Sequence, residues 1–178
     1  MILGISGKSG SGKSKLAWDI HTSSHQLYMP YSFVRSLSTP LIESCRTVLP
    51  TTTPYVKPYT EEERKNLQDL GMWLRERNPD ALIECMCRYG GIDKWYKKNT
   101  LAIIDDIRFP NEASWVRHNR GLLVRLDVVH NPLEGEASTH ESETALDDWT
   151  DWDGVYTLEN SAPPLLWLMD ILRGRYDA

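Results

Sequence analysis

The chain has 178 residues, of which 40% are hydrophobic, and this is enough for one domain with a substantial core. Its formal net charge of -5 argues against a global basic field for nucleic acid, so phosphate binding must depend on local groups. No apolar run reaches the length of a membrane span, and the first residues do not resemble a signal peptide. We therefore expect a soluble, cytoplasmic protein without a membrane partner.

The amino-terminal segment MILGISGKSGSGKSKLAWDI predicts a strand, a loop and a helix in that order. Residues 1–5 are a short apolar run, and residues 15–20 have apolar side chains at helical spacing. Between them, residues 7–14 read GKSGSGKS and fit the pattern G-x-x-x-x-G-K-[ST]. Because a helix start directs backbone N–H groups and its dipole at one anion, this segment predicts a phosphate-binding P-loop.

The P-loop pattern assigns a role to its lysine and its serine. Lys13 is expected to reach the β- and γ-phosphates of ATP, and the Ser14 hydroxyl to ligate Mg²⁺. A dinucleotide-binding loop is disfavoured, because its third glycine position holds Lys15. The predicted ATP-binding residues of this segment are Gly10, Ser11, Gly12, Lys13, Ser14 and Lys15.

The next part of the chain is predicted to be mainly helical. Residues 26–29 are predicted to form a short strand, followed by a turn at Pro30 and a helix through residue 44. Residues 48–58, rich in proline and threonine, are predicted to form an irregular loop. Thr60 and the glutamate three residues later form a capping box, which predicts the start of a helix. A further helix is predicted to begin at Pro79 and to be interrupted at Gly90-Gly91.

The carboxyl-terminal part alternates strands and helices. The run LAIID at residues 101–105 predicts a buried strand that ends in acid. The remaining predicted elements are a helix at 110–119, strands at 122–129 and 155–158, and a helix at 163–173.

This alternation predicts an α/β protein of the P-loop NTPase fold, with a mostly parallel five-stranded sheet and helices on both faces. Such sheets bind ligands beyond the carboxyl ends of their strands, so the P-loop and the acid after LAIID are expected at the same edge. We predict a single domain over residues 1–178, in which residues 30–98 form a helical insertion that binds the acceptor.

The segment DDIRFPNE at residues 105–112 is dense in charge directly after the predicted strand. A carboxylate at this place holds the Mg²⁺ shell in P-loop enzymes. A helix cap with surface ion pairs is the alternative. Because side chains alternate along a strand, Asp105 and Asp106 cannot both face the metal if both are extended.

The segments DDIRFPNEA, KPYTEEERKNLQDLG, THESETAL and VYTLEN together resemble the deoxynucleoside monophosphate kinases of tailed bacteriophages. The match runs in the same order from residue 2 to about residue 168. That family shows a P-loop, D-x-R followed by N-E or H-E, H-x-[ST]-E, and a closing strand with an asparagine loop. The resemblance implies transfer of phosphate from Mg·ATP to a deoxynucleoside 5′-monophosphate, in phage nucleotide metabolism and the host cytoplasm.

The resemblance also implies site residues. Asp106, in preference to Asp105, would serve the metal, and Arg108 would lie near the transferring or substrate phosphate, so Lys13, Asp106 and Arg108 form the predicted catalytic set. Asn160 would border the donor base. The predicted substrate-binding residues are Arg35, Lys57, Arg64, Gly71, Glu112, His140 and Glu143. Ser14 is a departure, because many members of the family have aspartate there.

Several alternatives remain open from the sequence. Arg35 and Arg64 could be solvated helix residues, and His140 could simply start a helix. A kinase of a hydroxymethylated pyrimidine in phage DNA would need a carboxylate base and a surface that follows DNA, which the net charge disfavours. A nucleotide-dependent switch or assembly ATPase would leave unexplained the lysines and arginines of the predicted acceptor segment, Arg35, Arg46, Lys57, Arg64 and Lys65. A homodimer is possible.

Overall fold

The computed structural model describes residues 1–27, 29–49, 59–89, 99–128, 140–158 and 164–176. The chain divides into two compact units. One, the sheet unit, comprises Met1–Arg35 and Asp93–Ala178, and the other, the helical unit, comprises Ser36–Ile92. Within the described ranges, no helix is both long and apolar enough to cross a membrane.

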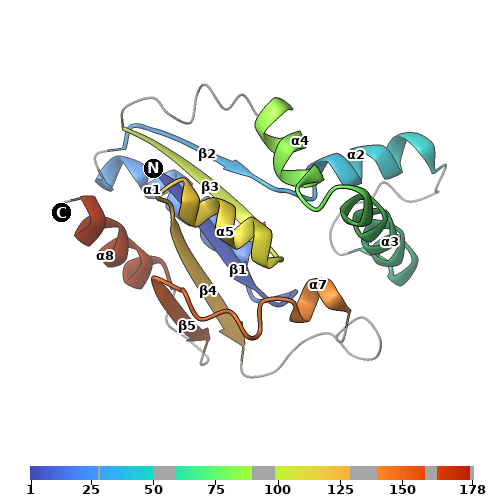
Figure 1. Ribbon diagram of the computed structural model, residues 1–178. Helices are drawn as coiled ribbons and strands as arrows, with labels where there is room; N and C mark the ends of the chain where they lie inside the picture. Colours follow the sequence, from blue (N-terminus) through green and yellow to red (C-terminus); the bar gives the residue numbers. More distant parts are fainter. Residues whose placement is uncertain (28, 50–58, 90–98, 129–139, 159–163, 177–178) are drawn as a thin grey trace. The chain divides into compact units, whose positions relative to one another are not determined.

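The sheet unit is built on a five-stranded sheet with the strand order β2-β3-β1-β4-β5, shown in Figure 1. Every neighbouring pair of strands is parallel. The prediction of a parallel α/β sheet of five strands is confirmed. The strands are β1 Ile2–Gly7, β2 Tyr31–Arg35, β3 Thr100–Ile107, β4 Leu122–Val128 and β5 Gly154–Leu158.

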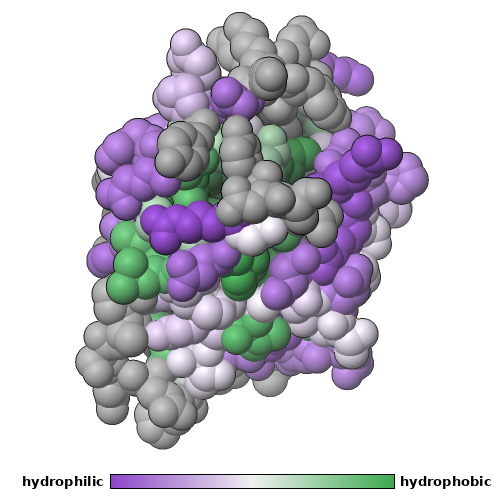
Figure 2. Space-filling model, turned by 90° about the vertical axis from the view of Figure 1, so that its left-hand side faces the viewer, coloured by the Kyte–Doolittle hydropathy of each residue, from purple (hydrophilic) through white to green (hydrophobic). Residues whose placement is uncertain are grey.

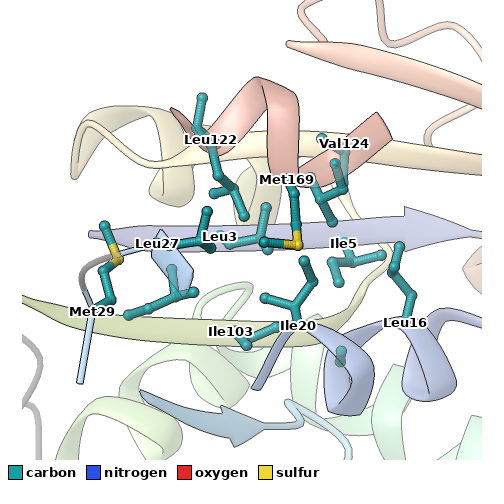
Figure 3. Packing of buried hydrophobic residues seen from close by; sticks show 14 of the residues in the cluster. Leu3, Ile5, Leu16, Ile20, Leu27, Met29, Ile103, Leu122, Val124 and Met169 are labelled. Atoms are coloured by element: carbon teal, nitrogen blue, oxygen red, sulfur yellow. The ribbon is translucent and has the colours of Figure 1, made fainter. Parts of the chain in front are cut away.

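Helices cover both faces of this sheet. Successive residues of the central strand β1 point to opposite faces, so each face presents side chains that a helix packs against. Leu3 and Ile5 point into the core shared with helices α1 and α8, whereas Gly4 faces α5, where an added Cβ would lie 3.1 Å from Val116. Figure 3 shows Met169 of α8 reaching toward β1 between Leu3 and Ile5. The helical elements of the sheet unit are α1 Lys13–Ser23, the 3-10 turn η1 Ser24–Leu27, α5 Pro110–His118, α7 Glu141–Thr144 and α8 Pro164–Tyr176.

The large apolar side chains that remain exposed are spread over separate elements. In the sheet unit they include Trp18 on α1, Val155 on β5 and Leu166 on α8. On the face shown in Figure 2, hydrophobic residues form small groups separated by hydrophilic ones. The burial of apolar surface in this unit is therefore concentrated in the core between the sheet and its helices.

The second strand lies five residues later than the sequence predicted. Residues 24–27 form η1, and the strand is β2, where Tyr31–Arg35 pairs with Thr100–Ile104. The prediction of a strand at 26–29 was wrong, and the helix predicted between the turn at Pro30 and residue 44 starts only at Thr39, in α2 Thr39–Val48. Proline cannot donate to a sheet ladder but is tolerated just before an edge strand, and β2 is an edge strand. YSFVR is also richer in β-formers than the segment before it.

In its described residues, the helical unit contains three helices that contact one another, α2 Thr39–Val48, α3 Glu61–Arg77 and α4 Ala81–Tyr89. The predicted capping box is present, with Thr60 Oγ1 accepting from Glu63 N and Glu63 Oε2 accepting from Thr60 N at 2.8 Å. The last of these helices starts at Ala81 rather than at Pro79, because Asn78 accepts bonds from two following N–H groups and closes a turn.

The boundaries of the predicted insertion also differ from the structure. Residues 30–98 were predicted as a helical insertion, but residues 31–35 are a strand of the sheet, and the helical unit is Ser36–Ile92. The predicted loop at 48–58 and the interruption at Gly90-Gly91 lie almost entirely outside the described residues. Binding of an acceptor by the helical unit stays a prediction.

Candidate functional site

The predicted P-loop connects β1 to α1 and depends on glycine at its turns. Gly7, Gly10 and Gly12 have φ values of 135°, 80° and 81°, where side-chain-bearing residues are strained. At Gly7 an added Cβ would also lie 2.2 Å from the backbone oxygen of Leu126. Gly12 precedes the first turn of α1 and offers no side-chain cap. The loop therefore presents its backbone and a helix start to a ligand, as a phosphate site requires.

Lys13 is buried, with 7% of its surface exposed, at the start of α1. Its Nζ donates to Gly7 O at 2.7 Å and to Lys8 O at 2.6 Å, so its charge lies within the loop. Ser14 follows it in the first turn of the helix. Lys15, by contrast, is exposed and pairs with Asp19 at 2.7 Å, so its side chain is directed along the helix.

The acidic pair lies at the same sheet edge as the P-loop. β3 is the parallel neighbour of β1, and Ile104 is opposite Gly4 while Ile107 is opposite Ser6. Two residues of β3, Asp105 and Asp106, therefore stand opposite one residue of β1, which defines a β-bulge.

The bulge corrects the sequence argument about the two carboxylates. Strict alternation would send Asp105 and Asp106 to opposite faces, but the strand is not regular where they lie. Asp105 is buried, with 7% exposed, and Asp106 is half-buried. The choice of Asp106 for the metal stays a prediction, and the argument that geometry excludes the use of both no longer holds.

Glu112 stabilises the start of α5. Its Oε2 accepts from Arg108 N at 2.7 Å and from Phe109 N at 3.0 Å, and only 1% of its surface is exposed. This is the capping interaction that the sequence analysis gave as the alternative for this segment. Glu112 therefore fixes the backbone that carries Arg108, and this burial leaves little room for direct contact with a substrate.

Arg108 and Glu143 form an ion pair beside the P-loop. Arg108 Nη1 donates to Glu143 Oε1 and also to Ser142 O at 3.2 Å. The other oxygen of Glu143 accepts from the backbone N–H of Ser9, a loop residue, at 2.7 Å. The side chains of Arg108 and Glu143 are 23% and 3% exposed. The structure thus brings together two predicted site residues and the loop.

His140 caps the short helix α7. Its Nδ1 accepts from Ser142 N at 3.2 Å and lies 2.9 Å from Ser142 Oγ. In the neutral ring this leaves the proton on Nε2. The helix-start interpretation of His140 therefore describes its geometry, while contact with a substrate stays a prediction.

The sequence analysis missed a group of charged residues that attaches this segment to the sheet. Arg125 of β4 donates to Leu146 O at 2.8 Å and to Asp147 Oδ1 at 2.9 Å, and Lys8 of the P-loop lies 3.5 Å from Asp147 Oδ2. Burial acts to lower the pKa of Arg125, but hydrogen bonds and charges from Asp127 and Asp147 outweigh it, so the pKa is raised and the guanidinium stays charged. No spacing in the sequence indicates these pairs; the only signal was the local density of acid.

The predicted acceptor residues lie in several places. Arg35 is at the carboxyl end of β2 rather than on a helix, and its guanidinium lies 5.1 Å from the centre of the Phe33 ring. In the helical unit, Arg64 is half-buried on α3, and Gly71 is buried where an added Cβ would lie 3.3 Å from Leu41 of α2. Gly71 therefore permits close packing of α2 and α3. Lys57 and Asn160 lie outside the described residues.

Oxygen-bearing side chains at the start of α1 and near the end of β3 are of the kind that would hold a magnesium ion. The donors are oxygens, the Ser14 hydroxyl and the carboxylates of Asp105 and Asp106, which Mg²⁺ prefers. Among the described residues, no group of three or more His, Cys, Asp or Glu side chains forms a metal cage. Mg²⁺ that is bound by one or two carboxylates and by phosphate oxygens of a nucleotide does not require such a group of side chains.

Comparison with known proteins adds two solved structures. No protein-family model matches the chain, and no curated protein does. A sugar kinase from Janibacter sp., solved unliganded, aligns with 98% of this chain and 91% of its own at 15% identity and a TM-score of 0.42. The APS kinase of Mycobacterium tuberculosis, solved with AMPPNP and APS, aligns with 96% of each chain at 15% identity and a TM-score of 0.44. Likeness at this level does not assign the fold. The fold is assigned from the chain itself: strand β1, a glycine-rich loop and helix α1 follow one another at the centre of a parallel sheet, and this arrangement is the P-loop NTPase fold.

Proposed function

We propose that the protein transfers the γ-phosphate of ATP to a deoxynucleoside 5′-monophosphate and so forms the diphosphate. The observation that carries the phosphotransfer is the P-loop with buried Lys13, at the sheet edge where the Asp105–Asp106 bulge lies near the end of the neighbouring strand β3. A cation beside phosphates and oxygen ligands for Mg²⁺ are the parts that phosphoryl transfer requires.

The donor side uses charges that the chain already places. Lys13 neutralises charge on the β- and γ-phosphates, and loop N–H groups fix their position. Bound Mg²⁺ would supply further neutralisation and orient the phosphate oxygens. Arg108, carried on the backbone that Glu112 caps, is the cation for the transferring phosphate. This reaction needs no general base, because the attacking phosphate oxygen of a monophosphate is already ionised at neutral pH.

The assignment of the acceptor depends on the resemblance to the phage kinases and on the cationic side chains between β1 and β3. Arg64 on α3 and Arg35 at the end of β2 are the described candidates for the acceptor phosphate, with Lys57 as a further candidate. Cationic side chains of this kind are the groups that bind an anionic acceptor. A deoxynucleoside monophosphate is the acceptor of the family that the sequence resembles.

A single mixed assay tests this proposal against its alternatives. ATP is incubated separately with each deoxynucleoside and ribonucleoside monophosphate, with DNA containing a hydroxymethylated pyrimidine, and with no acceptor. The proposal predicts diphosphate formation from at least one deoxynucleoside monophosphate, absent in Lys13→Ala. Transfer of the γ-phosphate only to DNA would indicate the DNA kinase. Release of inorganic phosphate alone would indicate a switch or assembly ATPase. Gel filtration of the same protein distinguishes a monomer from a homodimer.

A further inference from the structure

A carboxylate of the protein itself lies on the phosphate loop. Glu143 Oε2 accepts from Ser9 N at 2.7 Å, and Glu143 Oε1 accepts from the guanidinium of Arg108. Ser9 and Glu143 are 134 positions apart in the sequence, so this contact is tertiary. The Glu143 side chain is only 3% exposed, and its negative charge is therefore held between a loop N–H and a cation.

The two donors around Glu143 form an anion site. A backbone N–H in a glycine-rich loop and an arginine fork are the groups by which proteins bind phosphate oxygens. A carboxylate satisfies the same donors, since it also offers two oxygens and a negative charge. A nucleotide phosphate carries more negative charge and more acceptor oxygens, so it can replace the carboxylate at these donors.

The segment that carries Glu143 has further attachments to the same edge of the sheet. We call residues 140–147, HESETALD, the acidic strap. Asp147 lies 3.5 Å from Lys8 Nζ in the P-loop, and Arg125 of β4 donates to Asp147 and to Leu146 O. Arg108 also donates to Ser142 O. Three cationic side chains, two of them on or beside the P-loop, thus bind the strap.

We propose that Glu143 competes with nucleotide phosphate for Ser9 N–H and Arg108, so that binding of nucleotide exchanges the carboxylate for a phosphate and releases the acidic strap from the loop. The proposal rests on the proposed function only in requiring that nucleotide phosphates bind at this loop. It requires no particular acceptor. Glu143 then lowers the affinity for nucleotide, the opposite of the effect expected of a residue that binds substrate or positions Arg108.

The test is equilibrium binding of ADP and of inorganic pyrophosphate, by calorimetry, to Glu143→Gln and to a matched control. Glutamine keeps the size of the side chain but removes its charge, so the competing interaction is weakened. We expect both ligands to bind Glu143→Gln about tenfold more tightly than wild type, because loss of one charge-assisted hydrogen bond changes an affinity by about that factor. Glu141→Gln makes the same change on an exposed side chain of α7 and should leave both affinities unchanged.

A second variant covers the case in which Glu143→Gln does not fold. Asp147→Asn weakens the strap's pairs with Lys8 and Arg125 without changing Ser9 or Arg108, and should tighten ADP binding by a smaller factor. Unchanged or weaker binding of ADP in the folded Glu143 variant, or in Asp147→Asn if only that variant folds, would overturn the proposal. If neither wild type nor any variant binds ADP or pyrophosphate, the loop is not a nucleotide site and the proposed function fails as well.

Discussion

Around the phosphate loop, polar contacts join segments that are far apart in the sequence, whereas at the start of α3 the described contacts join close neighbours. In the sheet unit, Ser9 binds Glu143 and Lys8 pairs with Asp147 across more than a hundred positions. In the helical unit, Thr60 and Glu63 form a capping box across three positions. The contacts around the candidate donor-phosphate site are therefore tertiary, while the start of the candidate acceptor helix is marked by a local capping box.

This contrast predicts that substitutions in the two regions separate the two substrates. A change in the loop network should act on ATP and on turnover. A change on α3 should act on the acceptor or on local stability. The following variants test that separation, and any of them that affects both substrates equally would weaken it.

The largest effect is expected for Lys13. Lys13→Ala and Lys13→Met should both reduce turnover by at least ~10²-fold, because removal of one electrostatic stabiliser of a transition state typically costs that much. Lys13→Met keeps the buried stem, so it tests the charge that now contacts Gly7 O and Lys8 O. Steady-state kinetics with circular dichroism as a control for folding measures this. Near-normal turnover in a folded variant would contradict the P-loop assignment.

Arg64 is the test in the helical unit. If it binds the acceptor phosphate, Arg64→Ala should raise the KM for the monophosphate by about one to two decades, the equivalent of roughly 1.5–3 kcal/mol for a charge-assisted contact. The KM for ATP should stay nearly constant. Arg64→Lys should recover only part of the loss, since a point charge replaces a planar fork. A solvated Arg64 predicts instead that both variants match wild type for both substrates.

The acidic pair gives a smaller and more specific effect. Asp106→Asn should raise the Mg²⁺ concentration for half-maximal rate by at least about tenfold, because even outer-shell changes have effects of that size. Asp105 is buried, so Asp105→Asn should act mainly on thermal stability. A Mg²⁺ titration of both variants decides the assignment. A larger shift in Asp105→Asn would mean that the bulge presents Asp105 to the metal.

The smallest effect is expected at the capping box of α3. Thr60→Ala should lower the free energy of unfolding by ~1 kcal/mol, and Thr60→Ser should keep it, because serine caps as well as threonine does. Urea denaturation measures the difference. With ATP varied at saturating acceptor, the KM for ATP should be the same in all three proteins. A change in that KM comparable to a change for the acceptor would show that the two regions do not act separately.

The parts of the fold that the sequence predicted are those set by local pattern. The P-loop could be predicted because the glycine spacing, a strand and a helix start lie within 20 residues. The capping box could be predicted because its threonine and glutamate are three residues apart. β2 was misplaced because Pro30 was interpreted as the end of a strand, whereas an edge strand starts directly after it.

The parts that the sequence could not predict depend on tertiary structure. The bulge at Asp105–Asp106 exists only in the register of β3 against β1, so periodicity predicted alternation instead. Glu143 was predicted from the resemblance, but its bond to Ser9 is a contact between distant segments that no local pattern encodes. Gly71 was predicted as a substrate-binding residue, while its packing against Leu41 depends on how α2 and α3 meet.

Transfer of label from γ-labelled ATP tests the central claim most directly. Wild type and Lys13→Ala are incubated with labelled ATP, Mg²⁺ and a mixture of the deoxynucleoside monophosphates, and the products are separated by chromatography. The account predicts that label appears in a deoxynucleoside diphosphate with wild type and not with the variant. Label found only in inorganic phosphate with wild type, at every acceptor concentration, would contradict it.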